Sequence, residues 1–136
     1  MIFNAQVTET VLGFDANLKQ PGNLTFDQVD INIGGGFNGS TGVFTAPIAG
    51  IYKMTFSGQS AFNKFEITFI EVQKFDSTVF SILDDNEAEN ADANNVSFTW
   101  MMILAVGDEV KLRSYNNLYA NYLFPLTFTG ELIHIG

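Results

Sequence analysis

Apolar and polar residues alternate along most of the chain, which is the pattern of half-buried β-strands. The clearest case is Gly50–Gly58, where Tyr52, Met54 and Phe56 fall on one face and polar residues separate them. Enrichment in Phe, Val, Ile, Thr and Tyr also favours strands over helices. The pattern predicts further strands at Phe3–Val7, Leu24–Ile33, Phe65–Lys74, Val79–Leu83, Val96–Val106, Val110–Tyr115 and Leu126–Ile135.

Turn residues separate these strands. Gln20–Asn23 contains Pro-Gly, and Asn38-Gly39 is a strong turn signal. Within Leu24–Ile33 the apolar residues shift from even positions, up to Phe26, to odd positions, from Val29 onward. This shift predicts a bulge or break near Asp27. The acidic segment 84–95 is small and polar throughout, so it is expected to be a loop.

Many short antiparallel strands, about ten in all, predict an all-β sandwich or jelly roll, with residues 1–136 as one domain. The inward phase of the strands places a set of residues in the core, namely Phe44, Tyr52, Phe56, Phe128 and Leu132. Gly130 lies between two of them and is expected to let a neighbouring aromatic ring or backbone approach closely.

One strand is apolar on both faces. Val96–Val106 is apolar on one face throughout, and its other face becomes apolar at Met101 and Ile103. A strand buried on both faces needs a second covering layer, and another subunit can supply it.

Composition narrows the class of protein. The chain is 46% hydrophobic with 14 Phe, enough for a core, and it has no Cys, so disulfides and Cys-based metal sites are excluded. Its longest apolar run, Trp100 to Val106, is seven residues long, against about 20 for a membrane helix. No signal peptide is visible at the start. The net charge of −9 argues against a nucleic-acid partner and against an anionic membrane surface.

Catalytic groups are scarce. His134 is the single His and lies near the end of the last strand, where a partly exposed surface His is expected rather than a catalytic base. Asp84 and Asp85 are paired carboxylates, but adjacent acids on a loop more often repel each other or bind a cation than hydrolyse a glycan. The sequence therefore predicts a protein that is not an enzyme.

The acidic segment is the best candidate for a metal site. Calcium prefers oxygen ligands from carboxylates and amides, and this segment supplies them densely, with Asp84, Asp85 and Asp92 as the candidate ligands. The alternative is a solvated acidic loop that keeps the protein soluble.

Four segments in order carry a family resemblance. They are Phe37-Asn38, Thr41–Phe56 with Pro47, Gly50 and Tyr52 at fixed spacing, Gly107–Leu112, and Thr127–Leu132. Together they resemble the globular head domain of the C1q family, within the C1q/tumour necrosis factor superfamily.

The resemblance implies an all-β fold, a ten-stranded antiparallel jelly-roll sandwich. It further implies a non-enzymatic homotrimer that recognises an extracellular protein or glycan ligand, in pattern recognition, innate immunity or signalling. It also implies that calcium, where bound, is held by the acidic loop near the threefold axis. Alternatives are a tumour-necrosis-factor-like receptor ligand and a structural trimerisation cap.

Three N-x-S/T triplets are acceptors for N-glycosylation if the chain is secreted. They begin at Asn23, Asn38 and Asn95.

Overall fold

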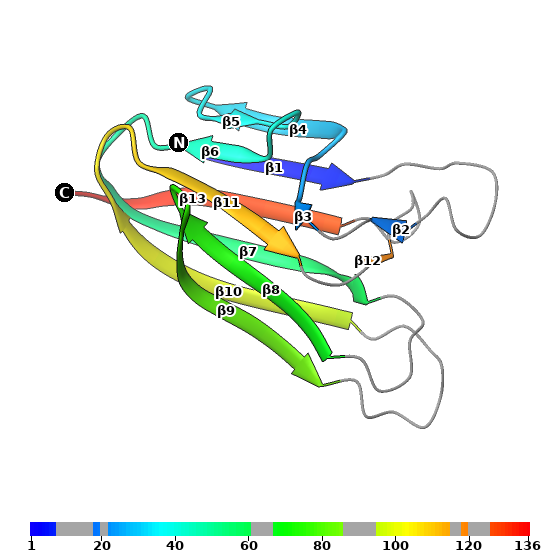
Figure 1. Ribbon diagram of the computed structural model, residues 1–136. Helices are drawn as coiled ribbons and strands as arrows, with labels where there is room; N and C mark the ends of the chain where they lie inside the picture. Colours follow the sequence, from blue (N-terminus) through cyan, green and yellow to red (C-terminus); the bar gives the residue numbers. More distant parts are fainter. Residues whose placement is uncertain (8–17, 20–21, 61–66, 86–94, 115–117, 120–125) are drawn as a thin grey trace.

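The computed structural model describes residues 1–7, 18–19, 22–60, 67–85, 95–114, 118–119 and 126–136. Within these ranges the chain forms two antiparallel sheets packed face to face (Figure 1). The strands are β1 (Ile2–Val7), β2 (Leu18–Lys19), β3 (Gly22–Asn23), β4 (Gln28–Ile33), β5 (Phe37–Asn38), β6 (Val43–Thr45), β7 (Gly50–Ser60), β8 (Ile67–Lys74), β9 (Ser77–Asp85), β10 (Asn95–Leu104), β11 (Glu109–Ser114), β12 (Leu118–Tyr119) and β13 (Leu126–Ile135).

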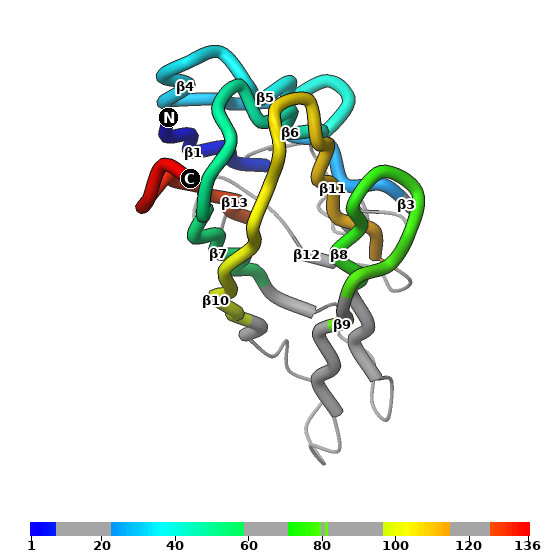
Figure 2. The backbone as a smooth tube through the Cα atoms, turned by 90° about the vertical axis from the view of Figure 1, so that its left-hand side faces the viewer, coloured from blue at the N-terminus to red at the C-terminus, as the bar shows by residue number. Residues whose placement is uncertain are grey.

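Sheet A has the order β4-β1-β13-β7-β10, and the two-residue segments β12 and β2 extend it beside β7. Sheet B has the order β5-β6-β11-β8-β9, with the two-residue segment β3 beside β11. Without those three short segments, each sheet has five strands. Figure 2 shows the sheets as two layers, with β4, β1, β13, β7 and β10 along one side. The predicted ten-stranded, C1q/TNF-like sandwich is confirmed.

The core is built from aromatic rings that join the two sheets. The Phe3 ring of sheet A stacks on Phe37 and Phe44 of sheet B, at centroid distances of 4.6 and 4.8 Å. Phe128 meets Phe3 edge-on at 5.0 Å. Of the five core residues predicted, Phe44, Tyr52, Phe56 and Phe128 are buried, and Leu132 is partly buried against the same cluster.

Gly130 has the close neighbour that its position predicted. A Cβ atom at residue 130 would lie 2.3 Å from Cε1 of Phe3, so the Phe3 ring rests directly on the glycine backbone. Any side chain at this position would displace the ring.

The turn between β10 and β11 is hydrogen-bonded to Ala46, the residue that follows β6. Asp108 Oδ2 accepts the Ala105 N–H at 2.8 Å and pairs with Lys74 at 3.0 Å. Ala46 N–H donates to Asp108 O, and Gly107 N–H donates to Ala46 O. Gly107 has φ +88°, a backbone conformation that a side chain would strain. The Ala105 N–H, followed by the Lys74 ammonium, holds the pKa of Asp108 below its usual value.

The break predicted near Asp27 is present and separates buried residues before it from exposed residues after it. Leu24 and Phe26 are buried, whereas all of β4 is exposed. The pairing of β1 with β4 shifts register between Asn4 and Ala5, and Val29 then lies beside Gly39 of sheet B. Ile31 and Ile33 therefore point outward, although the alternating pattern alone resembles a half-buried strand.

Two local predictions were wrong. Gly22–Asn23, expected in a turn, forms β3 against β11. Asp84 and Asp85, expected in the acidic loop, end strand β9, where they pair with Thr68 and Ile67 of β8. Asn95, the last residue of that expected loop, begins β10. In each case pairing with a neighbouring strand outweighs the local composition.

Replacing Phe56 by Ala should remove a fully buried ring and leave a cavity, at a cost of about 3–5 kcal/mol in the free energy of unfolding. Denaturant titration measures this loss. Ser57→Ala, one residue along and on the opposite face, is the matched control and should change stability little. Equal losses in the two variants would contradict the assigned phase of β7.

Asp108→Asn should lower the melting temperature at neutral pH, and the difference from the parent should shrink below about pH 4, near the ordinary carboxyl pKa. A carboxyl group whose pKa is lower in the folded state than in the unfolded state stabilises the fold at pH values above its unfolded-state pKa. That contribution is lost as the pH falls through the folded pKa. Thermal melts across this range test it, with Asp30→Asn on exposed β4 as the control, since the Asp30 carboxylate accepts a hydrogen bond from the neutral Gln28 amide. A difference that does not vary with pH would refute the linkage.

Candidate interaction face

The side of sheet A that points away from sheet B is called here the outer face. Because side chains alternate along each strand, the burial of Tyr52, Met54 and Phe56 forces Lys53 and Thr55 to this face. Its members among the described residues include Ile2, Asn4, Ile31, Ile33, Lys53, Thr55, Thr99, Met101, Ile103, Thr129 and Glu131.

Strand register arranges these side chains in rows across the sheet. One row is polar in its centre and runs from β10 to β4 as Thr99, Thr55, Thr129, Asn4 and Ile31. The hydroxyl groups of Thr55 and Thr99 are hydrogen-bonded at 3.0 Å. The next row is Met101, Lys53, Glu131, Ile2 and Ile33. Both rows have apolar residues at the β4 end, and the second also has one at the β10 end.

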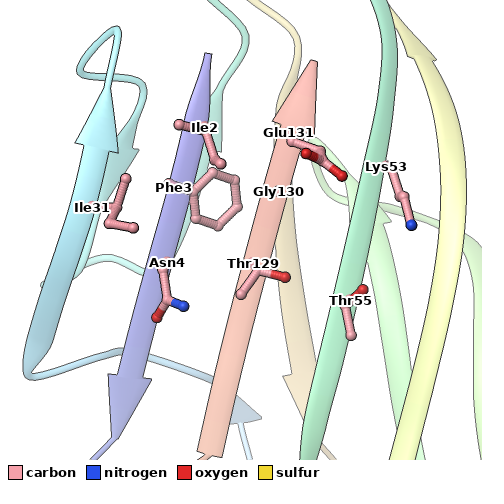
Figure 3. A pocket seen from close by; sticks show the side chains of 9 residues that line it. All are labelled: Ile2, Phe3, Asn4, Ile31, Lys53, Thr55, Thr129, Gly130 and Glu131. Atoms are coloured by element: carbon pink, nitrogen blue, oxygen red, sulfur yellow. The ribbon is translucent and has the colours of Figure 1, made fainter. Parts of the chain in front are cut away.

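A hollow of about 240 Å³ lies in the middle of the outer face. Figure 3 shows the side chains around it, which come from β4, β1, β13 and β7. It is lined by Ile2, Phe3, Asn4, Ile31, Lys53, Thr55, Thr129, Gly130 and Glu131. The hollow therefore combines hydroxyl, amide and charged groups with an apolar border, which suits contact with another protein surface.

Asn4 leaves an unmet hydrogen-bonding group in this hollow. Its Oδ1 atom is buried and has no hydrogen-bond partner within the described ranges. Such an orphaned acceptor costs roughly 1–3 kcal/mol, so a donor from outside the protomer would be stabilising here.

Lys53 and Glu131 face each other in the strand register but form no ion pair in the part of the chain that the structure describes. Figure 3 shows the Lys53 ammonium on the side of β7 that faces away from Glu131. Lys74 and Lys111, by contrast, are paired with Asp108 and Asp76 at 3.0 and 2.7 Å. The outer face thus presents Lys53 and Glu131 as opposite charges that a second molecule can pair.

The two edge strands give the outer face two apolar rims. On β10, Met101 and Ile103 are 66% and 78% exposed. On β4, Ile31 and Ile33 are 41% and 62% exposed. The sequence predicted a covering subunit from Met101 and Ile103, but the β4 rim and the unpaired groups between the rims were missed. The unpaired groups could have been suspected from the sequence, because Lys53 and Thr55 alternate with the buried residues of their strand and must point outward.

The predicted metal ligands do not form a described site. Asp84 and Asp85 lie on β9, and Asp92 lies outside the described residues. Where the structure is described, no group of three or more His, Asp or Glu residues is placed to hold a metal ion. Calcium binding therefore stays a prediction.

The remaining sequence-derived candidates are on the surface or outside the described ranges. His134 is exposed on β13, as expected for a surface histidine. Across the described ranges, no helix has the length and apolar character to cross a membrane.

Comparisons with known proteins agree with this architecture. The C1q domain profile matches residues 3–133. Complement C1q tumor necrosis factor-related protein 3 of mouse and of human are each 33% identical over 116 residues, covering 85% of this chain. The chain spans about half the length of these curated relatives, because the aligned region is 46% of each.

Solved structures show the same fold. The globular domain of zebrafish complement 1qA protein superposes with a TM-score of 0.73 at 21% identity, covering 99% of this chain and 98% of that one. Murine APRIL at pH 5.0 gives a TM-score of 0.66 at 12% identity, covering 97% and 100%. The sequence matches extend over most of the chain and come from a non-enzymatic family. The chain therefore belongs to the C1q domain family.

Proposed function

We propose that this chain is a C1q-like recognition module that assembles as a homotrimer through its outer face and binds an extracellular protein or glycan ligand. The observation that supports assembly is the pair of exposed apolar rims on one sheet. Exposed apolar side chains rimming a polar centre are typical of a protein interface. In this proposal, residues 1–136 form one domain.

The position of the rims suits contact between copies. The β10 rim and the β4 rim lie on opposite edges of the same face, so the β10 rim of one copy can cover the β4 rim of the next. Such a head-to-tail contact closes into a ring when the rotation allows it. Members of the C1q/tumour necrosis factor superfamily typically form trimers, which favours a ring of three.

The polar centre supports the same assembly. Within the described ranges Asn4 Oδ1 is buried without a hydrogen-bond partner, and the exposed side chains of Lys53 and Glu131 form no ion pair, so a neighbouring copy can supply a partner for each of them. A neighbouring copy supplies a lysine, a carboxylate and several hydroxyl groups on the same face. Association would bury the charges of Lys53 and Glu131, and pairing between copies would offset the cost of removing them from water.

Recognition follows from assembly. Three copies present three equivalent ligand surfaces, so weak individual contacts combine into a stronger one when the ligand is repetitive. Pattern recognition, innate immunity and signalling outside the cell all use this property. The alternative is a tumour-necrosis-factor-like receptor ligand, and the fold that this chain shares with murine APRIL is compatible with it. The matches to the C1q domain profile and to C1q-related proteins favour the C1q-like role.

Met101→Glu together with Ile103→Glu should convert the trimer into single chains, because association would bury six carboxylates against apolar groups. Light scattering should give three chains of 15.0 kDa for the parent and one for the variant. The control is Phe75→Asn, which removes an exposed aromatic from the turn of sheet B at φ +55°, a conformation that Asn tolerates. A parent protein that scatters as one chain or two would refute the trimer.

We further propose that the acidic segment 84–95 binds calcium near the threefold axis, with Asp84, Asp85 and Asp92 as ligands. Three copies would concentrate negative charge there, and a bound cation would offset the repulsion. Calcium should raise the melting temperature relative to chelator, by an amount equivalent to about 2.7 kcal/mol at a hundredfold excess over Kd.

Asp85→Asn with Asp92→Asn should abolish that difference, whereas Asp30→Asn on exposed β4 should preserve it. Coincident melting curves with calcium and with chelator would leave the segment as a solvated acidic surface.

A further inference from the structure

The turn between β5 and β6 is fixed by its backbone. Asn38 O accepts the Gly42 N–H at 2.8 Å, and Gly42 has φ +73°. Gly39 O accepts the Phe26 N–H at 2.8 Å, which ties the turn to the segment before β4. A Cβ atom at Gly39 would lie 2.5 Å from Phe26 O, so a larger residue could not occupy this position unchanged.

The Asn38 side chain is held through its oxygen only. It is exposed, and Oδ1 accepts the Ser40 N–H at 3.0 Å and the Ser40 hydroxyl at 2.7 Å. No hydrogen bond from its Nδ2 atom occurs within the described residues, so this nitrogen is available at the surface. Asn32 gives the contrast, since its Nδ2 donates to Phe37 O at 2.8 Å and is needed for the fold.

The surroundings leave room for a bulky substituent. Asn38 lies at a hollow of about 590 Å³, whose other lining residues are Thr25, Phe26, Asp27, Val29, Gly39 and Ser40. The turn belongs to sheet B, whereas the proposed trimer contact uses the outer face of sheet A. Val29 of β4 also lines this hollow, but it lies beside Gly39, whereas Ile31 and Ile33 point to the outer face. A group attached at Asn38 would therefore start on the side of β4 opposite the proposed contact.

The other two N-x-S/T triplets are less favourable. Asn23 is exposed, but its triplet continues into buried Leu24 and half-buried Thr25, whereas the triplet of Asn38 continues into half-buried Gly39 and exposed Ser40. Asn95 begins β10, the strand that carries Met101 and Ile103 of the proposed contact, and pairs with Gln59 of β7. Asn38 is the acceptor that combines a surface turn, an uncommitted amide nitrogen and a position away from the assembly face.

We propose that Asn38 is an N-glycosylation site and carries the main glycan of the secreted protein. The proposal rests on the extracellular location proposed above. The donor is a lipid diphosphate-linked oligosaccharide, brought to the Asn-x-Ser triplet by a transferase of the secretory lumen. Asn38 Nδ2 attacks C1 of the first sugar and loses one proton. The C1–O bond to the diphosphate breaks, and the lipid diphosphate leaves. The Oδ1 hydrogen bonds to Ser40 persist in the product.

The test is secretion of the chain from insect or mammalian cells behind a foreign signal peptide, followed by mapping of the peptide that contains residue 38. We expect a glycan at Asn38 that an N-glycan amidase removes, leaving Asp. Asn38→Gln and Ser40→Ala should each abolish the main glycosylated band, while Ser40→Thr should retain it. Asn23→Gln is the matched control and should leave that band in place.

Recovery of secreted protein with unmodified Asn38 would overturn the proposal, as would a main band that persists in Asn38→Gln. Light scattering on the same material keeps the two proposals separate. A glycosylated single chain would refute the trimer but support the site, and a trimer without a glycan at Asn38 would do the reverse.

Discussion

The packing of Phe3 on the bare backbone of Gly130 determines much of this structure. The ring sits between the sheets, stacked on Phe37 and Phe44 and edge-on to Phe128. It fixes the phase of β1, and that phase sends Ile2 and Asn4 to the outer face. The core contact and the candidate interaction face are therefore two sides of the same strand.

Strand alternation explains why much of the fold could be predicted. Large apolar residues alternate with other residues at Tyr52, Met54 and Phe56 on β7, so its inward and outward positions can be read from the sequence. Leu126, Phe128 and Leu132 do the same on β13. Gly130 was interpretable for a similar reason, because a glycine among inward-facing residues has few uses other than close approach. The family resemblance also rested on turn and core residues that the fold requires locally.

The features that were missed depend on partners far away in sequence. Asp84 and Asp85 become strand residues because β8 lies beside them, which their polar composition does not indicate. The outward orientation of Ile31 and Ile33 depends on a register shift opposite Asn4, and nothing within β4 encodes it. The isolation of Lys53 from Glu131 and the orphaned Asn4 oxygen appear only once three strands are in register.

The order of strands in sheet A also constrains how the protein is made. β1 can pair with β4 early in synthesis, but its other edge pairs with β13, the last strand described, and stays unpaired until β13 leaves the ribosome. At a synthesis rate of roughly 5–20 residues per second, that delay lasts many seconds. Until then Phe3 lacks the Gly130 surface, and the nascent chain exposes apolar side chains that chaperones recognise. Sheet A therefore closes only after β13 has been synthesised, and premature termination anywhere before β13 leaves β7 and β1 without the strand that joins them.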